Sequence, residues 1–112
     1  MEKLYDVRIT PHAEQSMQEI ESYIAVDLMA PQTAVKLLRA LKKAVDSLEM
    51  FPGRIHLTPE EPWHNLGIRR LVVKNYYVYF WIDEANLRVH ITDVIYARQN
   101  QPAQLADMFL ND

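Results

Sequence analysis

Two kinds of hydrophobic spacing divide the first half of the chain into one strand and two helices. In LYDVRI, residues 4–9, apolar and polar side chains alternate, which predicts a short strand. Thr10 offers a capping hydroxyl and Pro11 a preset first turn, so a helix is expected to begin there. Its apolar positions recur every three or four residues, at Ala13, Met17, Ile20, Ile24 and Leu28. A second helical stripe follows Pro31 and ends near residues 51–53, with Ala34, Leu37, Leu38, Leu41, Val45 and Leu48. The short link makes the two helices an antiparallel hairpin.

The second half of the chain is predicted to form three strands. The runs 68–73, 76–82 and 87–97 are rich in β-branched and aromatic residues. Residues 52–66 hold three prolines and form a loop, residues 74–75 and 83–86 are turns, and residues 101–112 form a short final helix. The order is β-α-α-β-β-β. We therefore predict an α+β fold whose small, mostly antiparallel sheet is covered on one face by the helical hairpin.

Alternation along the three strands assigns each side chain to one face of the sheet. The face under the helices is expected to carry Leu71, Val73, Tyr76, Val78, Phe80, Ile82, Leu87, Val89, Ile91 and Ile95. The open face, expected to lie in water, carries Arg70, Val72, Lys74, Tyr77, Tyr79, Trp81, Asp83, Arg88, His90, Thr92, Val94, Tyr96 and Arg98. The open face therefore interleaves cations with aromatic rings.

Composition narrows the classes of function. With 112 residues, 49% of them apolar and 24% charged, residues 1–112 are expected to be one soluble globular domain. The net charge of −3 gives no general attraction to nucleic acid, so a polyanion would need a local patch. The chain has no cysteine and only two isolated glycines, which excludes thiolate metal sites and glycine-rich phosphate loops, and we expect no cofactor. It has no apolar run of membrane-spanning length and no signal peptide, so a cytoplasmic location without membrane contact is expected.

The open face has three interpretations. Aromatic rings stack on the bases of single-stranded nucleic acid, and arginine pairs with phosphate oxygens. Tyr, Trp and Arg are also the residue types enriched where protein partners bind most strongly. The third interpretation is an ordinary solvated sheet face, since these residues favour strands and tolerate water.

Four segments follow one another in a particular order: ITPHA at the start of the first helix, LEMFP at the end of the second, the hairpin GIRRLVVKNYYVYFWIDE, and VIYARQ in the last strand. In this order they resemble the RelE/ParE superfamily of type II toxins. The resemblance extends from about residue 4 to residue 105. It implies a compact α+β toxin, often part of a plasmid stabilization system, neutralised by a cognate antitoxin. RelE-like members cleave mRNA on the ribosome as mRNA interferases, and ParE-like members inhibit DNA gyrase. A homodimer and a hetero-oligomer with the antitoxin both agree with the resemblance.

The resemblance also suggests residues for RNA cleavage. Arg98 corresponds to the arginine that stabilises the scissile phosphate, and Arg70, with Arg69 beside it, to the basic residues before the hairpin. Tyr77 stands where RelE-like nucleases have an arginine. The C-terminal residues lack the expected tyrosine or histidine, for which Tyr96 and His90 are the nearby substitutes.

A metal-independent endoribonuclease would use these residues in distinct roles. We expect His90 to be the acid or base, Arg98 and Arg70 to bind the phosphate, and Tyr77, Trp81, Tyr96 and Lys74 to contact the substrate. Gyrase inhibition needs no catalytic set, and a non-toxic relative that only binds an antitoxin or regulates transcription also agrees with an incomplete one.

Two further groups of residues are expected to have ordinary structural roles. His56, Glu60, Glu61 and His64 have no metal-site spacing and are expected to be solvated loop residues. Lys36, Arg39, Lys42 and Lys43 form a basic surface that is solvated or paired with glutamates of the first helix.

Overall fold

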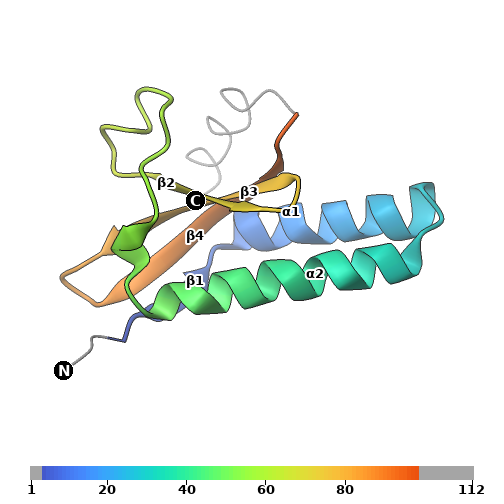
Figure 1. Ribbon diagram of the computed structural model, residues 1–112, viewed down its shortest axis with the longest axis horizontal. Coiled ribbons are helices and arrows are strands. Elements are labelled where there is room, and N and C mark those ends of the chain that lie inside the picture. The colour runs from blue at the N-terminus through green and yellow to red at the C-terminus, as the bar shows by residue number, and fades with distance from the viewer. Residues whose placement is uncertain (1–3, 99–112) are drawn as a thin grey trace.

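The computed structural model describes residues 4–98 and confirms the predicted α+β fold (Figure 1). Its elements are β1 (Asp6–Ile9), α1 (Pro11–Ser22), a π-helical turn (Tyr23–Asp27), α2 (Pro31–Asp46), two short 3-10 turns (Ser47–Glu49 and Pro52–Arg54), β2 (Arg69–Val73), β3 (Tyr76–Asp83) and β4 (Arg88–Tyr96). The predicted C-terminal helix lies outside the described residues.

Both helices begin where the sequence places them. The hydroxyl of Thr10 accepts a hydrogen bond from the backbone N–H of Ala13 at 3.1 Å, and Pro11 occupies the first turn of α1. Pro31 likewise occupies the first turn of α2, although Ala30 before it provides no side-chain cap. The first helical stripe continues beyond α1 into the π-helical turn, which buries Ile24. The two helices run antiparallel below the sheet in Figure 1.

The sheet has the strand order β1-β4-β3-β2. β2 pairs antiparallel with β3, and β3 pairs antiparallel with β4, as two hairpins require. β1 pairs parallel with β4, with Val7 opposite Val89 and Ile9 opposite Ile91. The first strand therefore lies hydrogen-bonded beside the last strand. The helical hairpin is part of the connection from β1 to the rest of the sheet.

The main core lies between the helices and the sheet. Its buried members are Ala13, Ile24, Ala34, Leu37, Leu41, Val45, Leu48, Val73, Val78, Phe80, Val89, Ile91 and Val94. The set combines residues of the two predicted helical stripes with residues of β2, β3 and β4 on the helix side of the sheet. Leu41 and Phe80 are fully buried within it, so the period of each element identified most of its core side chains.

A β-bulge in β4 reverses part of the predicted face assignment. Tyr79 pairs with Asp93 and Phe80 with Ile91, so Thr92 is one extra residue on β4. The extra residue shifts the alternation after it. Val94 consequently packs in the main core, and Ile95 packs on the opposite face with Tyr79. The predictions for Val94 and Ile95 were therefore wrong.

The face expected to be open is largely covered by the loop between α2 and β2. Figure 1 shows this loop on the side of the sheet away from the helices. Its backbone is held by hydrogen bonds from Thr58 N to Ile68 O at 2.8 Å and from Arg70 N to His56 O at 3.1 Å. Ile68, Tyr79 and Ile95 form a second buried cluster there, packed by Trp63 and Tyr77. Tyr79 was expected in water, but its exposure is 0% because the loop folds over it.

Candidate interaction surfaces of the sheet

Arg70 is held within the second cluster by groups on both sides of it. Its Nη1 lies 3.2 Å from Oε1 of Glu60, and its guanidinium lies 4.3 Å from the centre of the Tyr77 ring. The Thr58 hydroxyl in turn donates to Glu60. The neighbouring Arg69 donates to the carbonyl oxygen of Ile55 at 2.6 Å. Both arginines before the hairpin therefore attach the loop to β2.

Tyr77 and Tyr79 pack edge to face in the same cluster, with ring centres 6.2 Å apart. The hydroxyl of Tyr79 is buried and has no hydrogen-bond partner of good geometry within residues 4–98. Burial, together with the charge of Glu60, raises the pKa of Tyr79 to about 12, although Arg70 opposes the rise. The tyrosines here are mainly packing groups, and Tyr79 offers no ring face to a nucleic-acid base.

The ion pair between Arg70 and Glu60 should give a measurable coupling energy between the two side chains. Both side chains are about three-quarters covered, with exposures of 24% and 28%. A double-mutant cycle of Arg70→Ala and Glu60→Ala should give about 1 kcal/mol of coupling in urea unfolding, the upper end for partly exposed pairs. The exposed Arg8–Asp6 pair is the control, and its cycle should give a value close to zero. Equal coupling in the two cycles would show that Glu60 does not anchor Arg70.

A second group of polar and aromatic side chains lies at the end of the β3–β4 hairpin. The rings of Trp81 and His90 stack with centres 4.5 Å apart and an angle of 20°. Nε2 of His90 lies 3.4 Å from Oδ2 of Asp83. Hydrogen bonds from Asn86 and from His90 lower the pKa of Asp83. One face of the His90 ring and one of its nitrogens thus already have partners.

Tyr96 and Lys74 lie on the helix side of the sheet and not on the predicted open face. Both line a groove between the helical hairpin and the β2–β3 turn. Tyr96 is turned there by the bulge in β4, which puts it against Tyr76 with ring centres 5.4 Å apart. Lys74 does not follow the alternation of side chains along the strand, because it lies in the β2–β3 turn with a left-handed φ of 54°. Arg98 follows β4 and is exposed to solvent.

The structure keeps His90 and Arg98, two of the residues predicted for catalysis, far apart. His90 is near the start of β4, while Arg98 lies beyond its end at Tyr96. At about 3.3 Å per residue, the strand separates His90 from Tyr96 by roughly 20 Å. Figure 1 shows these two ends of β4 at opposite ends of the sheet. A single phosphate cannot contact both residues.

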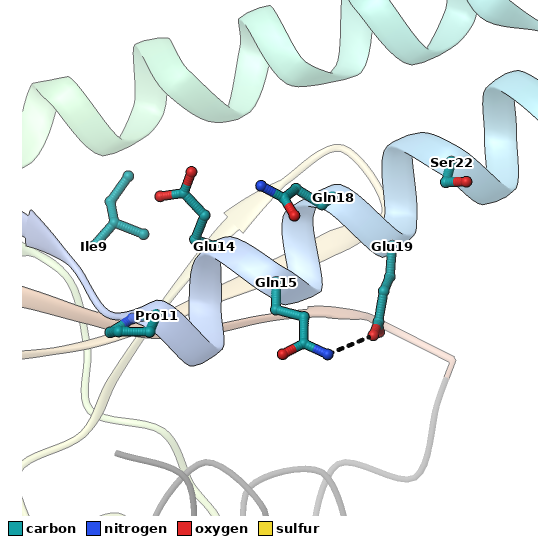
Figure 2. Close-up of a pocket in the computed structure, with 7 residues that line it drawn as sticks. All are labelled: Ile9, Pro11, Glu14, Gln15, Gln18, Glu19 and Ser22. Atoms are coloured by element: carbon teal, nitrogen blue, oxygen red, sulfur yellow. Dashed lines mark hydrogen bonds between the residues drawn. The ribbon is translucent and has the colours of Figure 1, made fainter.

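A shallow hollow along α1 is lined mostly by polar and acidic side chains, unlike the aromatic and basic side chains of the sheet (Figure 2). Its lining comes from α1 and the chain just before it, and comprises Ile9, Pro11, Glu14, Gln15, Gln18, Glu19 and Ser22. Gln15 donates a hydrogen bond to Glu19 at 3.1 Å. The two glutamates have no cation beside them in this lining, so the hollow would repel phosphate groups.

The described residues contain no cluster that is suited to a metal and no membrane helix. No three His, Asp or Glu side chains of residues 4–98 converge as metal ligands would. His64 Nδ1 instead lies 3.0 Å from the carbonyl oxygen of Thr58, and Glu60 binds Arg70, so these two loop residues are not simply solvated. Within the same residues, no helix combines the length and apolar composition needed to cross a bilayer.

The sequence did not reveal a buried polar cluster between α1 and β4. Asp93 accepts a hydrogen bond from the hydroxyl of Ser16 at 2.7 Å, and its other oxygen lies 3.1 Å from Nε2 of His12. Asp93 is only 1% exposed. The available signal was the polar pair Thr92-Asp93, which interrupts an apolar strand at the bulge.

Comparison with known proteins supports the assignment of the fold. A family model described as the ParE toxin of type II toxin–antitoxin system, parDE, matches residues 7–101. No curated protein sequence matches the chain significantly.

Solved structures of several other proteins share the fold. A chromosomal ParDE system from P. aeruginosa aligns with a TM-score of 0.70 at 18% identity, covering 86% of this chain and 99% of the other. The RelBE2 toxin–antitoxin complex from Mycobacterium tuberculosis aligns with a TM-score of 0.59 at 18% identity, covering 83% and 91%. A mutant of the E. coli toxin RelE in the free state aligns with a TM-score of 0.50 at 10% identity, covering 96% and 93%.

Proposed function

The chain belongs to the ParE family of toxins from type II toxin–antitoxin systems, and we propose that it arrests growth by binding DNA gyrase rather than by cleaving mRNA. The proposal includes a cognate antitoxin as its neutralising partner. The structural neighbours from P. aeruginosa and M. tuberculosis are themselves toxin–antitoxin systems, which supports such a partner.

The observation that carries this choice is the separation of the residues suggested for RNA cleavage. Arg70 is already bound by Glu60 and Tyr77, and His90 by Asp83 and Trp81. Arg98 lies at the far end of β4. General acid–base cleavage needs its groups within hydrogen-bond reach of one phosphodiester, a geometry that these residues do not form.

The charge of the chain also favours a protein target. A net charge of −3 is unsuited to docking on ribosomal RNA, where each phosphate contact must be made by a cation. Protein binding can instead depend on local apolar and aromatic residues, several of which are exposed, among them Phe51, Leu66 and Trp81.

Expression of the chain in bacteria should stop growth, and co-expression of the small protein encoded beside it should restore growth. We expect the purified chain to inhibit supercoiling by gyrase, while the 5′ ends of cellular mRNA stay unchanged. His90→Ala and Arg98→Ala should retain full toxicity, like the surface control Arg39→Ala, because none of these residues performs chemistry. Growth arrest should therefore be independent of all three substitutions.

New mRNA ends that disappear in Arg98→Ala would contradict the proposal and support an mRNA interferase. Normal growth together with a stable complex with the neighbouring gene product would support the alternative of a non-toxic relative. The two readouts, RNA ends and DNA supercoiling, separate these outcomes in one induction experiment.

A further inference from the structure

Exposed apolar side chains lie together at the end of the sheet where β1 begins and α2 ends. They are Leu4, Met50, Phe51 and Leu87, and we call them the apolar end surface. Leu4 forms an antiparallel bridge with Met50, which places their side chains side by side. The backbone N–H of Asp6 donates to the carbonyl oxygen of Leu87 at 2.8 Å, so the β3–β4 turn adjoins the same end. Figure 1 shows this end of the molecule away from the turn between the two helices.

Phe51 has a backbone conformation that a bulky residue rarely adopts. Its φ of 49° and ψ of 52° lie in the left-handed region, where phenylalanine is a genuine outlier. The guanidinium of Arg54 holds this turn, because its Nη1 donates to the carbonyl oxygens of Met50 at 2.7 Å and of Phe51 at 3.0 Å. Pro52, whose ring fixes its φ, follows directly. The side chain of Phe51 is 61% exposed, so this turn presents an aromatic ring to solvent.

Leu87 combines the same two features in the β3–β4 turn. Its φ is 50°, and its side chain is exposed. Glycine adopts a positive φ without strain, yet the two glycines of the chain stand at neither position. Because neither side chain is buried, folding alone does not explain an apolar residue there. Backbone strain that is kept at exposed apolar side chains indicates a functional role for those side chains.

Carboxylates predominate among the charged groups around the apolar end surface. Asp46, Glu49 and Glu84 are exposed and form no ion pair within residues 4–98. The guanidinium of Arg54 is bound to backbone carbonyls, and Arg88 is partly buried at the start of β4. This surface should therefore attract a protein surface that carries cations and repel phosphate groups.

We propose that the chain binds DNA gyrase through the apolar end surface, with the ring of Phe51 as the anchor that enters an apolar pocket of the enzyme. This inference rests on the gyrase inhibition proposed above. An exposed aromatic ring on a fixed backbone loses little freedom on binding, and aromatic anchors dominate the energy of many protein interfaces. An enzyme that binds DNA must carry cations along its DNA path, so carboxylates around the anchor suit its surface.

The test replaces the two left-handed apolar residues by glycine. Phe51→Gly and Leu87→Gly remove the side chains and keep the backbone conformation, because glycine adopts a positive φ freely. Half-inhibition of gyrase supercoiling should need about tenfold more of the purified Phe51→Gly chain, and still more of the double variant. The midpoint of urea unfolding should not fall in either protein, since the substitutions relieve backbone strain. Binding and folding are thereby measured separately.

Val72 on β2 is the matched control. It is also 61% exposed, and β2 is the edge strand farthest from β1 in the sheet. Val72→Ala should inhibit gyrase like the unchanged chain. Phe51→Tyr keeps an aromatic ring at the anchor position and should also inhibit at a similar concentration.

The outcomes separate this surface from the proposed function itself. If the unchanged chain and Phe51→Gly inhibit gyrase equally, the apolar end surface is refuted while gyrase inhibition stands. If the unchanged chain does not inhibit gyrase at all, both proposals fail. An equal loss in Val72→Ala would show a general effect of surface substitutions and would also refute the assignment. Self-association that Phe51→Gly abolishes, with inhibition retained, would assign the surface to a second copy of the chain.

Discussion

Replacing Tyr79 by alanine is expected to lower the free energy of unfolding by about 3–5 kcal/mol, the usual cost of removing a large aromatic ring from a core. Tyr79 is fully buried between β3 and the loop that precedes β2, with Ile68 and Ile95 as neighbours. The loss should appear as a lower midpoint in urea unfolding. Retention of stability would mean that the loop does not cover this face of the sheet.

The conservative change Tyr79→Phe separates packing from polar interaction at the same position. The hydroxyl of Tyr79 is buried close to Arg70 but forms no hydrogen bond of good geometry within residues 4–98. Because a buried polar group without a partner costs free energy, Tyr79→Phe should leave the protein equally stable or more stable. A loss of more than about 1 kcal/mol, the typical net worth of one hydrogen bond, would instead show that the hydroxyl has a partner.

Asp93→Ala is the second substitution with a large expected effect, a loss of about 3 kcal/mol. It would leave the hydroxyl of Ser16, the ring of His12 and the backbone N–H of Val94 without their shared acceptor. Each unsatisfied buried group costs about 1–3 kcal/mol, partly relieved where water can enter. Asp93→Asn keeps an acceptor oxygen for Ser16 and Val94 and should cost much less. Equal losses in the two variants would mean that the charge, and not the hydrogen bonds, holds α1 to β4.

The burial of Asp93 also predicts that the free energy of unfolding depends on pH. Burial raises the pKa of the Asp93 carboxyl above its ordinary value of 3.8, although hydrogen bonds from Ser16 and His12 oppose this. The folded protein therefore binds this proton more tightly than the unfolded chain does. Its contribution to stability is fully present below pH 3.8 and is lost as the pH rises through the folded-state pKa.

The pH effect can be measured against Asp93→Asn, which cannot titrate at this position. The unfolding free energy of the unchanged chain, relative to the variant, should fall as the pH rises from about 4 towards 7. Urea unfolding of both proteins at several pH values measures this difference. A relative stability that rises with pH would show that the hydrogen bonds to Asp93 outweigh its burial.

The sequence predicted the elements well because each of them follows a local rule. Thr10 and Pro11 begin α1 through interactions within one helical turn, and Leu37, Leu41 and Val45 define the buried stripe of α2 by their spacing alone. In β3, the separation of Val78 and Phe80 from Tyr77 and Trp81 follows from the pleat of a regular strand. These predictions needed no knowledge of distant residues.

The candidate site was harder to predict because it depends on how distant segments meet. One extra residue at Thr92 moves Val94 and Tyr96 to the helix side, an outcome that strict alternation cannot anticipate. Glu60, far from the strand in sequence, reaches Arg70 only because the loop folds back over the sheet. The sequence therefore predicted Arg70 as a phosphate ligand, whereas in the folded chain its guanidinium is paired with Glu60.

The sequence by itself determined the order of strands and helices, the helical stripes and the resemblance to the RelE/ParE superfamily, since these are properties of local spacing and of motif order. The tertiary structure alone decided which of the aromatic and basic side chains are accessible. In the folded chain Tyr79 is buried and Arg70 is paired with Glu60. His90 lies far from the end of β4, and Lys74 and Tyr96 line the groove beside the helices. The physical reason is that accessibility depends on long-range packing of a loop and on one bulge, neither of which has a period along the chain.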